Sequence, residues 1–246
     1  MKLLAVLEAT TAHFTKHGLS SPRLQSELLI AHALNLPRLA LYLQFERELT
    51  PPELETLRPL VRRRASREPV QHITGTTSFS GLTLQCTPSA LIPRPETELL
   101  VEHASQILKN LPPGLVIDVG TGTGAIPLAV ARKHPSHRYL GLDISPDALL
   151  LAQENASRSS SAPPEGTKIE WKQSDLLHGF TETALLITAN LPYLTSDEIA
   201  AAEPEVRHDP LLALDGGKDG LDLFRRLGRG GDRDEPQALP LRSRRK

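Results

Sequence analysis

The stretch LVIDVGTGTGAI, residues 115–126, decides the fold of this chain. Its first five residues are a short apolar run of the kind that forms a buried strand, and its end opens an apolar helical pattern that continues to Lys133. Glycines at 120, 122 and 124 lie between the two elements. Because glycine permits sharp turns and a close approach of the backbone to a ligand, this strand–loop–helix unit predicts an α/β sheet with a binding loop.

The sequence after this unit repeats the alternation of apolar runs and helical patterns. Further strands are predicted at 138–143, 168–173 and 184–190, and a further helix at 146–156. Strands that alternate with helices in this way are typical of a parallel sheet with helices on both faces. The predicted fold class is therefore α/β with a Rossmann-like sheet.

Residues 1–72 differ, because their apolar residues recur only at helical spacings. Gly18 ends a first helix, Ser21-Pro22 is expected to cap and begin a second, and Pro51 begins a third. We predict a small helical bundle that precedes the sheet domain in the sequence. The arginines at 62–67, in the third helix, are interpreted as a solvated helix face.

The other boundaries follow changes in composition. Residues 73–93 have a strand-like pattern around Gly81 and predict a β-hairpin that links the bundle to a sheet domain at 94–227. Residues 228–246 are polar and contain no strand-like run, so they are predicted to form a disordered tail.

Composition limits the function classes. The 246 residues carry a formal net charge of −1, which argues against nucleic-acid binding by bulk charge. A single cysteine, Cys86, excludes a disulfide or a cysteine zinc site within the chain, and the nine histidines show no metal-ligand spacing, so no metal is predicted. No run approaches the roughly 18 apolar residues of a membrane span, and we expect a soluble, cytoplasmic monomer.

The glycine loop predicts a cofactor site. Gly120, Thr121, Gly122, Thr123 and Gly124 lead into a helix whose free N–H groups suit an anionic group, and Asp143 ends the next strand, where a carboxylate can bind ribose hydroxyls. The absence of a following Gly-Lys-Ser/Thr excludes a P-loop. Both S-adenosylmethionine and NAD are compatible with the loop, and we favour S-adenosylmethionine.

The tetrapeptide Asn190-Leu191-Pro192-Tyr193 follows the last predicted strand and should face the same crevice. An amide or aryl-amine nitrogen is a poor nucleophile whose two N–H bonds need acceptors, and the Asn190 side-chain oxygen and the Leu191 carbonyl can supply them. Pro192 restricts this backbone, and the Tyr193 ring can contact a planar acceptor. The pattern predicts methyl transfer to a planar nitrogen, although an ordinary turn has the same composition.

Several further segments carry a resemblance to one family. They are IPRPETELLVE (92–102), DVGTGTGAI (118–126), EPEVR (203–207), ALDGG (213–217) and DGLD (219–222). With the bundle and the tetrapeptide, they make the chain similar to the peptide chain release factor glutamine methyltransferases, which methylate the glutamine of a release factor's Gly-Gly-Gln motif. The resemblance extends from the bundle to about Leu227.

The resemblance implies a class I S-adenosylmethionine-dependent protein-(glutamine-N5) methyltransferase. It implies that Gly120–Gly124, Asp143, Leu176 and Asn190 contact the cofactor and that Asn190–Tyr193 hold the substrate glutamine. Leu176 stands where the family often has an aromatic residue. The resemblance further implies that the segment 93–98 lies over the cofactor, that the bundle helps to bind the release factor, and that no nucleic acid is the direct substrate.

The chain departs from the family pattern at two places. Leu191 replaces the family's usual proline, and Asn-Leu-Pro-Tyr also occurs in ribosomal RNA adenine dimethyltransferases, so a ribosomal RNA adenine N6-methyltransferase is the alternative. Those enzymes, however, lack the Pro-Arg-Pro-Glu-Thr-Glu segment. After Leu227 the resemblance stops, which is typical of a truncated or frame-shifted chain. On this hypothesis the sheet lacks its last strands, and an inactive or unstable remnant is the third alternative.

Overall fold

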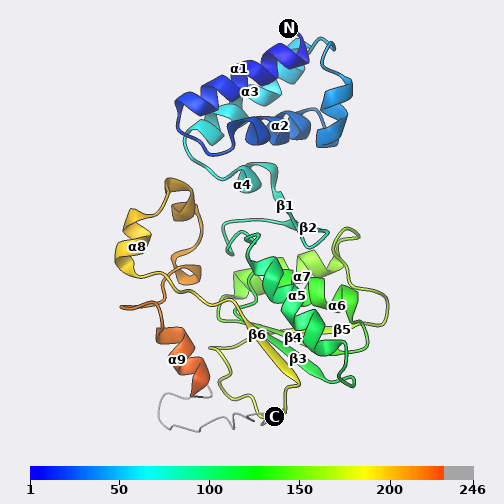
Figure 1. The fold of residues 1–246 in the computed structure, drawn as a ribbon, viewed down its shortest axis with the longest axis vertical. Helices are drawn as coiled ribbons and strands as arrows, with labels where there is room; N and C mark the ends of the chain where they lie inside the picture. Colours follow the sequence, from blue (N-terminus) through cyan, green and yellow to red (C-terminus); the bar gives the residue numbers. More distant parts are fainter. Residues whose placement is uncertain (230–246) are drawn as a thin grey trace. The chain divides into compact units, whose positions relative to one another are not determined.

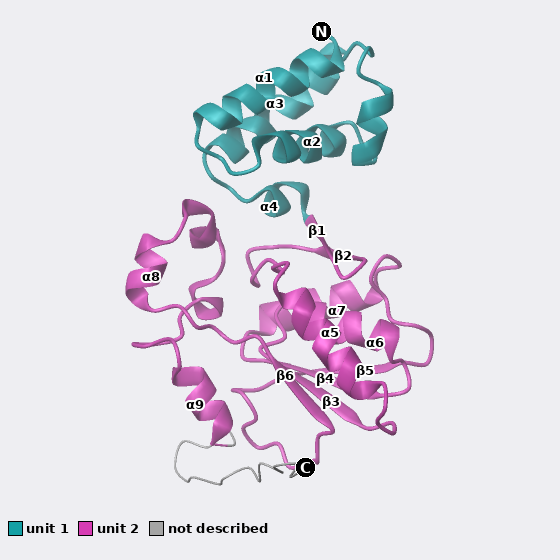
Figure 2. Cartoon of the chain, viewed as in Figure 1, with its two compact units in different colours: residues 1–75 teal, residues 76–246 magenta. Residues whose placement is uncertain are grey.

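The computed structural model describes residues 1–229, which divide into two compact units (Figures 1 and 2). Unit 1 is Met1–Gly75, and unit 2 begins at Thr76. The hairpin that the sequence predicts as a separate linker is part of unit 2 by this division. The predicted tail at 228–246 lies outside the described residues from 230 onward.

Unit 1 contains only helices, which confirms the predicted helical region in front of the sheet. They are α1 (Leu3–Lys16), α2 (Pro22–Ala33), the 3-10 helix η1 (Arg38–Leu43), α3 (Pro51–Ala65) and α4 (Val70–Thr74). Their apolar faces meet in one buried cluster that includes Leu3, Leu7, Phe14, Leu29, Ile30 and Leu41, all fully inaccessible to solvent. The helical spacing of these residues therefore reflects a shared core.

The starts of two helices show how local chemistry sets their bounds. The Thr50 hydroxyl and the Glu53 carboxylate form a capping box at the start of α3. Pro22 occupies the first turn of α2, and Ser21 is the N-cap residue of this helix, both as expected. Ser21 has a φ of 45°, outside the extended conformation that N-cap residues normally adopt, and its side chain makes no cap hydrogen bond.

The arginines at 62–67 do not all lie on a solvated face. Arg64 is 2% exposed, and its guanidinium donates to the Gln25 side chain and to the Glu68 carbonyl oxygen. Arg63 forms an ion pair with Glu68 at 2.5 Å. Arg67 donates to the Gly18 carbonyl oxygen at 2.9 Å. These contacts tie the end of α3 to other parts of unit 1.

Glu27 is the centre of a second polar cluster in unit 1. Its buried carboxylate accepts hydrogen bonds from Arg23 at 2.9 Å, Arg38 at 2.8 Å and Tyr42 at 2.6 Å. Burial opposes ionisation, but the hydrogen bonds from Tyr42, Arg23 and Arg38 outweigh it and hold the pKa of Glu27 below its ordinary value. This carboxylate joins α2 to η1.

Unit 2 begins with a β-hairpin and continues as an α/β sheet. Its strands are β1 (Thr76–Phe79), β2 (Leu82–Gln85), β3 (Leu115–Val119), β4 (Arg138–Asp143), β5 (Lys168–Gln173) and β6 (Leu186–Ala189). Its helices are α5 (Thr97–Leu108), α6 (Ala125–Lys133), α7 (Pro146–Ser157), α8 (Ser196–Ala201), η2 (Pro204–His208), η3 (Leu211–Ala213) and α9 (Asp222–Gly228).

The sheet has the strand order β5-β4-β3-β6, and all three pairings are parallel. This confirms the predicted parallel α/β sheet. Every residue of β3 is buried, as expected for a central strand with both faces covered. In the described part of the chain, β6 is an edge strand, and it is two residues shorter at its start than the predicted strand at 184–190.

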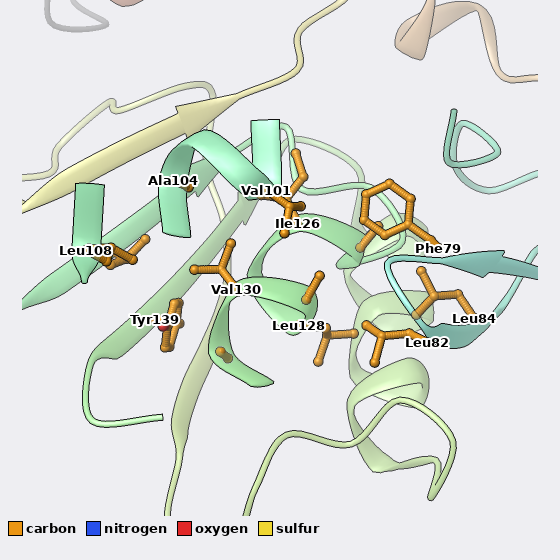
Figure 3. Close-up of a cluster of buried hydrophobic side chains, with 14 residues drawn as sticks. Phe79, Leu82, Leu84, Val101, Ala104, Leu108, Ile126, Leu128, Val130 and Tyr139 are labelled. Atoms are coloured by element: carbon orange, nitrogen blue, oxygen red, sulfur yellow. The ribbon is translucent and has the colours of Figure 1, made fainter. Parts of the chain in front are cut away.

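Two apolar clusters cover the two faces of the sheet. Val116 belongs to a cluster with α5, α6 and the β1–β2 hairpin, in which Phe79, Leu82 and Leu84 are at most 1% exposed (Figure 3). Its neighbours in β3, Leu115 and Ile117, belong to the other cluster, which includes side chains of α9. This alternation is the one expected of a strand with helices on both sides.

We predict that Glu27→Gln lowers the free energy of unfolding at pH 7 by about 1–2 kcal/mol, because a charged acceptor is lost from a buried network. A lowered pKa contributes stability that is present above the ordinary value, 4.5, and is lost as the pH falls through the folded-state value. The difference between variant and wild type should therefore shrink in acid. Urea unfolding at several pH values measures it.

The matched control is Glu55→Gln, since Glu55 pairs with Arg58 on an exposed part of α3. This change should move the free energy of unfolding by no more than about 0.5 kcal/mol. Equal losses in the two variants would contradict the role of the Glu27 network.

Candidate active site

The carboxyl ends of β3, β4 and β6 border a cavity of about 240 Å³ in unit 2. Its lining includes Gly120–Thr123 after β3, Asp143–Ser145 at the end of β4, Ser174–Leu176 after β5, and Asn190–Pro192 after β6. The parallel topology puts these four segments at one edge of the sheet. The cavity therefore contains most of the site residues that the sequence suggests.

Two of the suggested residues have other surroundings. Gly124 does not line the cavity, and a Cβ atom there would lie 2.8 Å from the Trp171 ring, so its glycine is needed for packing as well as for its φ of 77°. Tyr193 also lies outside the lining and is 62% exposed. Its ring is free to contact a molecule that approaches from solvent.

The glycine loop is held by backbone hydrogen bonds. The N–H groups of Gly120 and Thr121 both donate to the Leu142 carbonyl oxygen, at 2.8 and 2.9 Å. Gly120 and Gly122 have φ values of 72° and 53°, which only glycine adopts without strain. A side chain at 120 would also meet Leu191 at 3.1 Å.

Asp143 is fixed by the loop that it faces. Its Oδ2 accepts from the Gly122 N–H at 2.8 Å, and its Oδ1 accepts from the Ser145 N–H at 3.0 Å. Each carboxylate oxygen has a further lone pair, so Asp143 can still accept hydrogen bonds from a ligand in the cavity. The two backbone donors set the direction in which those lone pairs point.

Asp118 is a buried acid at the start of the DVGTGTGAI motif, and the sequence alone predicts no role for it. It is 1% exposed and accepts a hydrogen bond from the Thr188 hydroxyl of β6 at 2.7 Å. Burial raises the pKa of Asp118 to about 7, against the effect of the Thr188 and Thr121 hydroxyls, and the negative charge of Asp143 adds to the rise. The side chain thus links β3 to β6 just below the cavity-lining residues.

The Asn190 loop is anchored at both of its first residues. Asn190 Nδ2 donates to the Thr97 hydroxyl oxygen at 3.3 Å, and both residues line the cavity. The Leu191 side chain is 3% exposed and belongs to the cluster formed by Leu115, Ile117 and their neighbours. Leucine in place of the family's proline therefore supplies an apolar anchor, while its backbone carbonyl is retained.

The segment 213–222 supports this loop from the other side. The Leu194 N–H donates to the Leu214 carbonyl oxygen at 3.0 Å, and the Gly216 N–H donates back to Leu194 at 2.8 Å. A Cβ atom at Gly216 would lie 2.6 Å from Tyr193 Cα, and one at Gly220 would lie 2.2 Å from the Tyr193 carbonyl oxygen. The glycines of this motif thus allow two backbone segments to touch.

Asp209 makes contacts beside the cavity that the sequence alone does not predict. Its fully buried side chain accepts from the Ile92 N–H at 3.2 Å and from the Arg94 guanidinium at 2.5 Å. The signal was the Pro-Arg-Pro-Glu-Thr-Glu segment, whose arginine needed an acidic partner that the sequence did not identify. The contact joins two walls of the cavity, since Pro93 and Pro210 both line it.

The remaining wall includes Leu176 and α9. Leu176 is 6% exposed with a φ of 53°, and it lines the cavity beside Leu223. Arg226 of α9 forms an ion pair with Asp175 at 2.6 Å. Leu176 therefore presents an apolar surface to a ligand without aromatic stacking.

These residues fit S-adenosylmethionine. The glycine loop gives backbone approach, Asp143 offers a carboxylate for hydroxyl groups, and Leu176 gives an apolar wall. Among residues 1–229, no group of three or more His, Cys, Asp or Glu residues could hold a metal ion. In the same residues, no helix is long and apolar enough to cross a membrane.

We predict that Asp118→Asn gains stability relative to wild type as the pH rises from about 4 to 7. A carboxyl with a raised pKa binds its proton more tightly in the folded state, so the wild type loses stability between the ordinary value, 3.8, and about 7. The free energy of unfolding of Asp118→Asn should rise relative to that of the wild type by about 1–3 kcal/mol and then level off. Unfolding measured at pH 5 and pH 8, with the exposed Glu154→Gln as control, checks it; a difference independent of pH would contradict it.

Two family models match the chain. One, described as "PrmC N-terminal domain", matches residues 5–75, which is nearly all of unit 1. The other, described as "Methyltransferase domain", matches residues 116–208. The second match covers the sheet, the glycine loop and the Asn190 tetrapeptide.

Curated relatives match across both units. The release factor glutamine methyltransferase of Geobacter sulfurreducens is 41% identical over 223 residues, which are 89% of this chain and 75% of that protein. The enzyme of the same name from Deinococcus radiodurans is 40% identical over 92% of this chain and 80% of its own length. That of Mycolicibacterium smegmatis is 39% identical over 91% of this chain and 77% of its own length. The chain belongs to the release factor glutamine methyltransferase family.

Proposed function

We propose that this chain transfers a methyl group from S-adenosylmethionine to the side-chain amide nitrogen of the glutamine in the Gly-Gly-Gln motif of peptide chain release factors. The observation that carries the proposal is the position of Asn190 and Leu191, which line the same cavity as the glycine loop and Asp143. The relatives named above support the choice of a release factor as the substrate.

The cofactor would be held by Gly120–Thr123, Asp143 and Leu176. When bound, S-adenosylmethionine supplies an electrophilic methyl group on a sulfonium centre. The Asp143 carboxylate, already oriented by Gly122 and Ser145, accepts hydrogen bonds from hydroxyl groups of the cofactor. The buried Leu176 offers an apolar surface to the ring system of the cofactor.

The substrate amide would be held by two oxygens. The Asn190 side-chain oxygen and the Leu191 carbonyl each accept one N–H of the glutamine amide, which fixes the nitrogen and directs its lone pair toward the methyl group. Neither oxygen is a strong base, so the proton that the nitrogen gives up leaves to water. Tyr193, which is exposed, contacts the planar amide and Pro192 limits the motion of this backbone.

The other parts of the chain have supporting roles in this proposal. The helices of unit 1 help to bind the release factor, and RNA is not a direct substrate. The enzyme acts as a monomer in the cytoplasm, where release factors are found. The matches to relatives across unit 1 as well as unit 2 support a shared mode of substrate binding.

The proposal predicts that the chain labels release factor, and not naked ribosomal RNA, when it is incubated with methyl-labelled S-adenosylmethionine. Asn190→Ala should lower the rate by about 100-fold or more, because a misplaced nitrogen loses the benefit of fixed alignment. Asn110→Ala, a change at an exposed asparagine beyond α5, should leave the rate unchanged. Labelled peptides identified by mass spectrometry should contain the Gly-Gly-Gln glutamine.

Other outcomes would contradict the proposal. Labelling of RNA adenine in place of the protein would make the chain an RNA methyltransferase. Labelling of neither substrate by a folded chain would make it an inactive member of the family. Full activity in Asn190→Ala would show that the acceptor site lies elsewhere.

Cofactor binding has a separate prediction. Asp143→Ala should weaken binding of S-adenosylhomocysteine about 10- to 100-fold, because the ribose acceptor is lost and the Gly122 and Ser145 N–H groups lose their partner. Asp147→Ala, at an exposed position four residues later, should have no comparable effect. Titration calorimetry of both variants measures this, and equal affinities would remove Asp143 from the site.

A further inference from the structure

The carboxamide of Asn190 has a donor end and an acceptor end, and only one suits the proposed substrate. A glutamine amide that presents N–H groups needs the Asn190 oxygen, so the Asn190 NH₂ group must point away from it. A carboxamide without a second partner can rotate by half a turn and present the wrong end. The NH₂ group therefore needs a hydrogen-bond acceptor of the protein that holds it in this orientation.

Thr97 is placed to do this. Its hydroxyl oxygen accepts a hydrogen bond from Asn190 Nδ2 at 3.3 Å, and both residues line the cavity. Thr97 begins α5, whereas Asn190 follows β6, so the contact joins distant parts of the chain. With the NH₂ group directed at Thr97, the Asn190 oxygen is left for the substrate.

The position of Thr97 is itself fixed. The Thr97 N–H donates to the Arg94 carbonyl oxygen at 3.0 Å, and Arg94 is paired with the fully buried carboxylate of Asp209. On the other side of Thr97, the Glu98 carboxylate accepts from the Ser80 N–H of the hairpin at 2.9 Å. The segment is thus held at both ends, and Thr97 has little freedom to follow a rotating amide.

From these contacts we infer that Thr97 is a positioning residue, which orients the Asn190 carboxamide so that its oxygen faces the substrate amide. The inference rests on the proposed function for the identity of that substrate. It gives the Pro-Arg-Pro-Glu-Thr-Glu segment a physical task beyond lining the cofactor cavity. Asp209, through Arg94, holds the segment in place for this task.

The first test compares two substitutions of Thr97 in the full chain. Thr97→Val removes the hydroxyl at nearly constant volume and should lower the single-turnover rate of release factor methylation about 10- to 100-fold. Thr97→Ser keeps the hydroxyl and should stay within about threefold of wild type. Binding of S-adenosylhomocysteine should change less than twofold in both, which separates orientation of the substrate amide from contact with the cofactor.

Three results would overturn the inference. They are a wild-type rate in Thr97→Val, an equal loss in Thr97→Ser, and a loss of S-adenosylhomocysteine affinity as large as the loss of rate. If Thr97→Val does not fold, Thr97→Ala removes the same hydroxyl and is judged by the same results. Thr56→Val is the matched control, because the Thr56 hydroxyl bonds only locally to the Pro52 carbonyl on an exposed helix face.

The second test observes the amide directly and does not need methyl transfer. The side-chain NH₂ signals of Asn190 are assigned in ¹⁵N-asparagine-labelled protein by their loss in Asn190→Asp. They should shift in Thr97→Val, stay near their wild-type positions in Thr97→Ser, and be unaffected in Thr56→Val. Unchanged signals in Thr97→Val would overturn the contact, whether or not the wild-type chain methylates release factor.

Discussion

Parallel pairing of β3 with β4 on one side and with β6 on the other brings the segments that follow these strands to one edge of the sheet. Parallel strands end at the same edge of a sheet, so the loops that follow them meet there. The glycine loop, Asp143 and Asn190 are far apart in sequence but follow adjacent strands. Asp118 and Thr188 reinforce this pairing with a side-chain hydrogen bond between β3 and β6.

Besides hydrogen bonds, several contacts at this edge are possible only because glycine has no side chain. Gly216 and Gly220 let one backbone segment touch another beside Tyr193, and Gly120 leaves room for Leu191. Gly141 has the same role inside the sheet, because a Cβ atom there would lie 2.4 Å from the Trp171 ring. Because these glycines let neighbouring segments pack closely, the segments and the polar side chains that they carry have defined positions.

The sequence was sufficient to predict the strands of the parallel sheet and several of the cavity-lining segments, because both depend on local patterns. Apolar runs placed β3, β4 and β5 at their observed bounds, and strand ends then located Asp143 and Asn190. Contacts that depend on three-dimensional proximity could not be predicted. The pairing of Arg94 with Asp209 is one example, and the burial of Arg64 within a run of arginines is another.

Leu191 shows how a loop can be restrained by packing at a position where the family usually has proline. Proline at this position would stiffen the backbone whose carbonyl we propose as an acceptor, whereas leucine leaves φ unrestricted by a ring. The buried Leu191 side chain restores part of this restraint by packing, since movement of the loop would expose it to water. Leu191 therefore both packs in the core and lines the cavity, so apolar burial restrains the backbone segment whose carbonyl we propose as an acceptor.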